Sequence, residues 1–256
     1  QHLAPMDVIL TDLAAVKRFC SVEEEIFALL IDHVKGRLKE EMKDGEQHLL
    51  DAETITVEIN GNQNLFPRFI SGLFREAKAE HSEPCFRFLW HATYNKAASL
   101  KIWTDGFTNT FASMMFNVYG AGLYFATDAK LSAKYAHRTD EGDVEMFLAL
   151  VSIGRVGVRE HLILQSMEES FGRVSEDERN NAFEDSMYLL GADLRSHVHR
   201  NPPEGCQSAT GPHMTEVVIY KHDYALPLFR VKFRLSNDGK DLPCPYARDT
   251  ACRQGR

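Results

Sequence analysis

Apolar residues near the amino terminus recur with the spacing of one helical face. Within residues 22–43 they fall on one side of an α-helix, at Ile26, Leu29, Leu30, Val34 and Leu38. Ser21 stands where an N-cap is expected, and acidic residues fill the first turn. After a turn at Asn60 and Gly61 the chain has the pattern of a second amphipathic helix. We interpret residues 1–50 as a helical extension.

The rest of the chain is dominated by apolar stretches of strand length. Residues 54–59 alternate in the manner of a half-buried strand. Further strands are predicted at residues 87–90, 123–126, 145–156, 214–220 and 227–235, and short helices at residues 96–103 and 130–137. Residues 156–212 are rich in polar groups and give no clear pattern. Short connections between the other late strands favour an α+β fold with a mostly antiparallel sheet.

Composition narrows the class of protein. The chain has 256 residues, of which 44% are hydrophobic, enough for the core of one large domain. Its net charge of −8 lacks the positive excess of a nucleic-acid-binding protein, so no nucleic-acid partner is indicated. No run approaches the roughly 18–20 apolar residues of a membrane span, and no secretory signal is recognisable, so we expect no membrane partner. The absence of an initiator methionine suggests a piece of a longer protein.

The five cysteines are scattered along the chain and include no Cys-x-x-Cys pair. An odd, dispersed set argues against a disulfide framework and against a structural zinc site. We therefore expect no metal, and an intracellular location in the cytoplasm or nucleus.

Several motifs, taken in order, are more specific than any one alone. They are FLWHAT at residues 88–93, a helix ending in DGF, YGAGLYFATDAKLSAKYA at 119–136, and TEVVIY at 215–220 followed by LPLFRVKF. Two weaker matches are VEINGNQNLF at 57–66 and PPEGCQSATG at 202–211. Together they resemble the catalytic domain of the poly(ADP-ribose) polymerase family, over about residues 55–233.

The resemblance implies an ADP-ribosyltransferase fold, in which two mostly antiparallel β-sheets with flanking helices form an NAD cleft. It places a catalytic domain at residues 51–240 and leaves 241–256 as a carboxy-terminal tail. NAD would be the co-substrate. The family's His-Tyr-Glu triad falls on His91, Tyr124 and Glu216.

The same resemblance implies a role for each residue of the site. His91 would hold the adenosine ribose, Tyr124 would stack on nicotinamide, and Glu216 would bind the nicotinamide ribose. Tyr135 matches a second stacking ring and Ser132 the hydroxyl that bonds the carboxamide. Beside them, Thr93 would lie near the ribose, and the backbone of Ala92 would grip the carboxamide.

The chemistry of the reaction suits these residue types. Cleavage of the nicotinamide–ribose bond builds positive charge on the sugar, as in glycoside hydrolysis. An ionised Glu216 at the ribose would interact more strongly as that charge grows, and could orient or deprotonate an acceptor. A neutral imidazole at His91 offers one donor and one acceptor to a ribose diol. Taken singly, however, a strand-end histidine or a core tyrosine is more often structural.

Three departures from the family pattern are visible. Ala92 replaces a usual glycine, and would be strained if the site needs a positive φ there. Cys206 and Gln207 replace the tyrosine and aspartate of the PP-x-G-Y-D-S-V segment. The loop at residues 108–120 is rich in Phe and Met, and is interpreted either as an apolar lid over NAD or as a packing element.

We expect a transferase that moves ADP-ribose to a protein side chain, by single transfers rather than polymer growth. Glu216 is compatible with elongation, but residues 156–212 are long and atypical. Alternatives are an inactive binding module of the same fold and a NAD glycohydrolase, in which water is the acceptor. A nucleic-acid acceptor is a further possibility that the acidic net charge disfavours.

Overall fold

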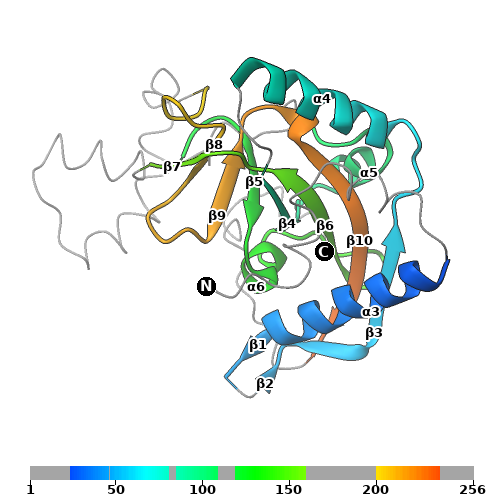
Figure 1. Ribbon diagram of the computed structural model, residues 1–256. Helices are drawn as coiled ribbons and strands as arrows, with labels where there is room; N and C mark the ends of the chain where they lie inside the picture. Colours follow the sequence, from blue (N-terminus) through cyan, green and yellow to red (C-terminus); the bar gives the residue numbers. More distant parts are fainter. Residues whose placement is uncertain (1–23, 46, 81–84, 109–118, 160–199, 237–256) are drawn as a thin grey trace, which may run out of the picture. The chain divides into compact units, whose positions relative to one another are not determined.

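The computed structural model describes residues 24–45, 47–80, 85–108, 119–159 and 200–236 (Figure 1). The proposed cap Ser21, the tail at 241–256 and most of the suggested lid at 108–120 lie outside the described residues. The chain divides into two compact units. The first unit comprises Gln1–Phe107, Phe125–Ser152 and Asp223–Arg256; the second unit comprises Thr108–Tyr124 and Ile153–His222.

Most of the helices and long strands belong to the first unit. They are α3 (Glu24–Glu41), β1 (Lys43–Asp44), β2 (Gln47–His48), β3 (Leu50–Ile59), α4 (Leu65–Glu80), β4 (Phe86–His91), α5 (Lys96–Asp105), α6 (Ala129–Ala133), β6 (Val144–Ser152) and β10 (Ala225–Leu235). The second unit holds β7 (Val156–Val158), β8 (Ser208–Thr210) and β9 (Glu216–Ile219). The 3₁₀ helix η3 (His222–Tyr224) begins at the last residue of the second unit and continues into the first. Strand β5 (Leu123–Ala126) begins in the second unit and ends in the first.

Within the first unit the strands run in the order β3-β10-β6-β4-β5, and the neighbouring pairs are antiparallel. All nine residues of β6 are buried, and β10 and β4 pair with it on its two edges. The core around this sheet contains Trp90, Phe229 and Phe233, which are fully buried. This explains why β6 reads as a nearly continuous apolar run in the sequence.

Helices complete the core of the first unit. Helix α4 packs on β10 and α3 packs on β3 (Figure 1). Val34 and Leu38, predicted on the inner face of α3, are fully buried in the same hydrophobic cluster as the strands, whereas Leu29 is 67% exposed. The predicted inner face is therefore confirmed at Val34 and Leu38, and wrong at Leu29.

Two predicted elements end earlier in the structure than the sequence predicts. The strand predicted at residues 145–156 is divided, because β6 ends at Ser152 and Gly154 turns the chain with a φ of +51° before β7 begins. The helix predicted at residues 130–137 ends at Ala133. Beyond it the backbone N–H of His137 donates to the carbonyl of Thr93 (3.0 Å), so a tertiary hydrogen bond takes the place of a further helical turn.

Within the second unit the order is β5-β9-β8-β7. Strands β8 and β9 are antiparallel, and β7 and β8 are parallel, so the pairing of strands is mixed. Strand β9 starts at Glu216 rather than at residue 214, where Met214 has a φ of +54°. The α+β class is confirmed. Apart from the β1–β2 pair, the described strands form one mixed, mostly antiparallel sheet of eight strands rather than the two expected sheets, because β5 lies between β4 and β9 in the strand order. No helix among the described residues is long and apolar enough to cross a membrane.

Candidate active site

His91 is the last residue of β4 and is half-buried. It pairs in register with Phe147 of β6, so its backbone is fixed by the centre of the sheet. Its ring lies edge-on to Phe107 (5.1 Å between centroids, 85°) and tilted against Phe125 (5.4 Å, 50°). Two aromatic contacts therefore hold the orientation of an imidazole at the point where a core strand reaches the surface.

Ala92 and Thr93 follow the end of β4 and are also half-buried. Met214 is the only non-glycine residue with a positive φ in the described part of the chain, so Ala92 has a negative φ. An alanine adopts such a backbone without strain, and it keeps the N–H and C=O that a carboxamide would need. The replacement of glycine by Ala92 is therefore accommodated by the fold.

Ser132 and Tyr135 lie in and just after α6. Ser132 is buried, with 4% of its surface exposed, and its carbonyl accepts a hydrogen bond from the N–H of Tyr135 (3.0 Å). Asp128 caps the helix by accepting from the N–H of Leu131 (3.0 Å). Two residues after Tyr135, His137 bonds to the carbonyl of Thr93, and this contact ties the segment to the end of β4.

The carboxy-terminal end of α3 holds both of these segments through Glu41. One carboxylate oxygen of Glu41 accepts hydrogen bonds from the indole N–H of Trp90 (2.6 Å) and from the backbone N–H of Ala129 (2.8 Å). Trp90 precedes His91, and Ala129 is the first residue of α6. Glu41 therefore joins the strand that carries His91 to the helix that carries Ser132.

Arg37, one helical turn before Glu41, adds a second set of bonds. Its Nε pairs with the other oxygen of Glu41 (2.6 Å). Its terminal nitrogens donate to the carbonyl of Phe88 in β4 (3.1 Å) and to that of Thr127 after β5 (3.3 Å). Sequence analysis missed both residues, because a glutamate and an arginine four apart on a helix are ordinarily a surface pair.

In the second unit, the hydroxyl of Tyr124 has a backbone partner on each side. It accepts from the N–H of Tyr119 (2.9 Å) and donates to the carbonyl of Gly120 (2.9 Å). Burial raises the pKa of Tyr124, and the nearby negative charge of Glu216 adds to that rise. The phenol therefore stays neutral, and its two hydrogen bonds hold the ring at a fixed angle.

Two further tyrosines build the surroundings of Tyr124. The hydroxyl of Tyr220 donates to the carbonyl of Tyr119 (2.7 Å), and both Tyr119 and Tyr124 pack on the small cluster that contains Tyr220. The ring of Tyr119 lies so close to Gly211 that an added Cβ there would overlap the phenol oxygen. Glycine at 211 is therefore required by this packing.

Glu216 is the first residue of β9 and is half-buried beside these rings. Burial raises the pKa of its carboxyl above the ordinary value of 4.5. Burial raises the pKa of both Tyr119 and Tyr124, and the negative charge of Glu216 adds to each rise. A partly desolvated carboxylate next to aromatic rings is suited to stabilising a positive charge on a bound molecule.

The altered PP-x-G-Y-D-S-V segment is well bonded despite its substitutions. The side-chain oxygen of Gln207 accepts from the N–H of Arg155 (2.5 Å), and its backbone N–H donates to the carbonyl of the same residue (2.8 Å). Gln207 packs closely against Gly154, where an added Cβ would lie 2.7 Å from its side-chain oxygen. The glutamine thus fixes the turn between β6 and β7.

The predicted site residues therefore form two groups. His91, Ala92, Thr93, Ser132 and Tyr135 belong to the first unit, and Tyr124 and Glu216 to the second. No group of three or more His, Cys, Asp or Glu side chains in the described ranges could hold a metal ion.

A comparison with known protein families supports the resemblance seen in the motifs. Residues 39–190, more than half of the chain, match the family described as the poly(ADP-ribose) polymerase catalytic domain. The match includes His91 and Tyr124, and it begins within α3, two residues before Glu41. No curated protein matches the sequence. The chain therefore belongs to the poly(ADP-ribose) polymerase catalytic-domain family.

Proposed function

We propose that this protein is a NAD-dependent ADP-ribosyltransferase that transfers single ADP-ribose units to a protein side chain. Family membership supports the reaction class and the use of NAD. The observation that carries the proposal is the half-buried position of Glu216 beside Tyr124 and Tyr119, where partial burial raises the pKa of its carboxyl. A surface glutamate at the start of an ordinary strand would remain solvated.

In this proposal the site residues bind NAD in the roles that the family resemblance implies. His91 holds the adenosine ribose, and Tyr124 and Tyr135 stack on the two faces of nicotinamide. Ser132 and the backbone of Ala92 bind the carboxamide. Stacking on a flat ring is worth about 0.5–1.5 kcal/mol per aromatic pair beyond burial, so both rings contribute to affinity.

Glu216 acts on the ribose in the reaction. As the bond between C1′ and the nicotinamide nitrogen breaks, its electron pair returns to the nitrogen and positive charge develops on the sugar. The carboxylate stabilises that charge and binds the 2′-hydroxyl. An acceptor side chain then attacks C1′ and loses its proton, while neutral nicotinamide leaves.

Mass spectrometry of the purified protein after incubation with NAD tests this proposal. We expect one or more additions of a single ADP-ribose unit, and their loss in Glu216→Gln. Free ADP-ribose with unmodified protein would indicate a NAD glycohydrolase instead. Unchanged NAD in the presence of candidate acceptors, with no binding by titration, would indicate an inactive module and overturn the proposal.

The net charge and the cysteines bear on the acceptor of ADP-ribose and on the cellular compartment. We infer a protein acceptor, because the net charge of −8 disfavours a nucleic acid. Cys85 and Cys206 are free thiols, which fits a reducing compartment such as the cytoplasm or nucleus. Digestion of the modified protein should release single ADP-ribose units, and a ladder of longer products would replace single transfer with polymer growth.

A further inference from the structure

His137 makes two contacts with one carbonyl at the end of β4. Its backbone N–H donates to the oxygen of Thr93 (3.0 Å), and its ring nitrogen Nδ1 lies 3.3 Å from the same oxygen. Only a ring that carries hydrogen on Nδ1 donates there. Because Thr93 follows Ala92, and His137 follows Tyr135 by two residues, this one side chain joins the two segments assigned to nicotinamide.

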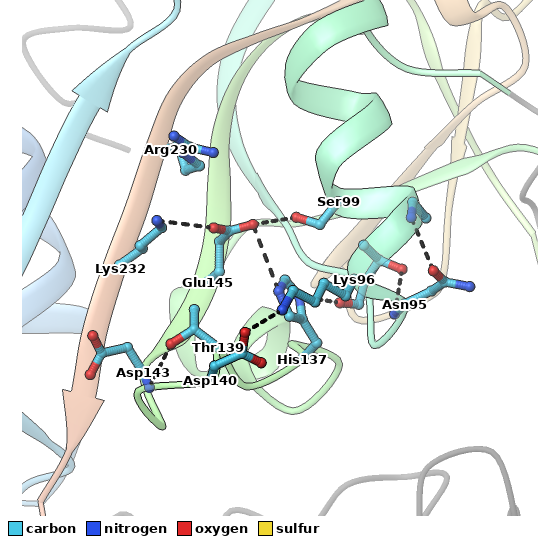
Figure 2. Close-up of polar contacts among 12 residues, drawn as sticks. Asn95, Lys96, Ser99, His137, Thr139, Asp140, Asp143, Glu145, Arg230 and Lys232 are labelled. Atoms are coloured by element: carbon cyan, nitrogen blue, oxygen red, sulfur yellow. Dashed lines mark hydrogen bonds and ion pairs between the residues drawn. The ribbon is translucent and has the colours of Figure 1, made fainter. Parts of the chain in front are cut away.

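The other side of the imidazole faces a buried carboxylate. Figure 2 shows Glu145 of β6 between His137, Ser99 of α5 and Lys232 of β10. Its carboxylate accepts a hydrogen bond from the hydroxyl of Ser99 (2.5 Å), and lies 3.8 Å from Nε2 of His137 and 3.6 Å from Nζ of Lys232. The side chains of His137 and Glu145 are only 8% and 9% exposed.

A carboxylate at this position of the sheet is costly. The residues of β6 next to Glu145 are Val144 and Met146, which are fully buried and apolar. An apolar side chain in place of a buried ion pair is often as stable or more stable. The presence of the buried Glu145 in this strand is therefore better explained by a role in orienting its partner, the imidazole of His137, than by a gain in stability.

We propose that His137, oriented by Glu145, is a positioning residue that fixes Ala92 and Thr93 for the carboxamide of nicotinamide. This inference rests on the proposed function. The ring holds the Thr93 carbonyl, so the preceding peptide keeps the direction in which the N–H and C=O of Ala92 meet the ligand. Glu145 prevents the ring from turning away from that carbonyl.

Two substitutions of His137 distinguish the role of its Nδ1, which faces Thr93, from that of its Nε2, which faces Glu145. In His137→Asn the amide nitrogen can occupy the place of Nδ1 and still donate to Thr93, whereas in His137→Gln it extends towards the place of Nε2 near Glu145. Affinities for nicotinamide and for ADP-ribose are measured by titration calorimetry, with KM and kcat for NAD. Lys96→Ala is the control, since Lys96 forms an exposed ion pair with Asp140 in the same region (2.7 Å).

We expect His137→Gln to lower the affinity for nicotinamide about three- to tenfold, as the loss of one hydrogen bond would. The KM for NAD should rise by a similar factor. Affinity for ADP-ribose, which lacks nicotinamide, should remain unchanged. His137→Asn should restore nicotinamide binding to within about twofold of the original protein. Lys96→Ala should change neither affinity.

The outcomes distinguish this inference from the proposed function. If the original protein binds neither NAD nor nicotinamide, both are overturned. If it binds both but His137→Gln binds nicotinamide normally, or loses nicotinamide and ADP-ribose equally, the positioning role is overturned and the transferase stands. Should His137→Gln fail to fold, Glu145→Gln replaces it in the test, because the amide oxygen of the glutamine can still accept the hydrogen bond from Ser99. In that variant the affinity for nicotinamide should fall while the affinity for ADP-ribose stays unchanged.

Discussion

The two units hold their site residues by different means. In the first unit, charged side chains bond the segments that carry His91 and Ser132: Glu41 bonds to Trp90 and Ala129, and Glu145 faces His137. In the second unit, Tyr124 is held by backbone groups and Glu216 lies among phenols. Burial, rather than a neighbouring charge, raises the pKa of Glu216.

This difference matches the work that each group is proposed to do. Residues that bind and orient a ligand benefit from rigid bonds to the core. A carboxylate that stabilises a transient positive charge acts best where no protein cation already neutralises it. The first unit is therefore expected to determine affinity and orientation, and Glu216 in the second unit to determine rate.

The largest effect should follow from removal of the Glu216 charge. We expect Glu216→Gln to lower kcat by about 10³-fold, of the order seen on loss of a group that stabilises transition-state charge. The affinity for NAD should change little, because the amide can still bond to the ribose hydroxyl. Single-turnover rates and titration calorimetry on the same preparation check both parts. Loss of affinity with an unchanged rate would reverse the proposed division of labour.

Tyr124 should affect affinity more than rate. Tyr124→Ala removes the stacking ring, and we expect NAD to bind about tenfold more weakly or worse. Tyr124→Phe keeps the ring but leaves the N–H of Tyr119 and the carbonyl of Gly120 without their side-chain partner. That variant should retain most of the affinity and lose about 1–3 kcal/mol of unfolding free energy. Equal binding by the alanine variant and the original protein would contradict stacking.

Glu41 should affect stability first. Glu41→Ala leaves the N–H groups of Trp90 and Ala129 and the guanidinium of Arg37 without their shared acceptor. Since this pair is partly exposed, we expect a loss of about 2–3 kcal/mol on denaturant unfolding, below the value for a fully buried pair. Glu41→Gln, which keeps an acceptor, should lose less. A stable Glu41→Ala variant would show that α3 is not needed to hold β4 and α6 together.

The smallest predicted effect is a dependence on pH. Because the folded pKa of Glu216 is raised above 4.5, its neutral form is the one the fold favours. Its contribution to stability is complete below the unfolded pKa and is lost as the pH rises through the folded pKa. Glu216→Gln should therefore become more stable relative to the original protein between acid and neutral pH, while the original kcat rises over the same range. Parallel thermal unfolding curves across that range would contradict the raised pKa.

The sequence predicts local elements best where a strand or helix is defined by its own residues. The apolar run LYFA coincides with β5, and the predicted strand at residues 87–90 differs from β4 by one residue at each end. The predicted helix at 130–137 fails after Ala133, because the bond between His137 and Thr93 joins positions 44 residues apart. A local pattern contains no information about such a contact.

The candidate site shows the same limit. Motifs identify His91, Tyr124 and Glu216 because their spacing is characteristic of a family, and their proposed roles stay predictions. Glu41, His137 and Glu145 have no motif, and each resembles an ordinary polar residue of a helix, loop or strand. Their contribution becomes visible only through the partners that the fold gives them.

A crystal structure of the Glu216→Gln variant with NAD tests the central claim most directly, since slow turnover should leave the dinucleotide intact. We predict one NAD molecule with the adenosine ribose at His91, nicotinamide on Tyr124 and its ribose at position 216. A dinucleotide bound away from any two of these positions would contradict the account.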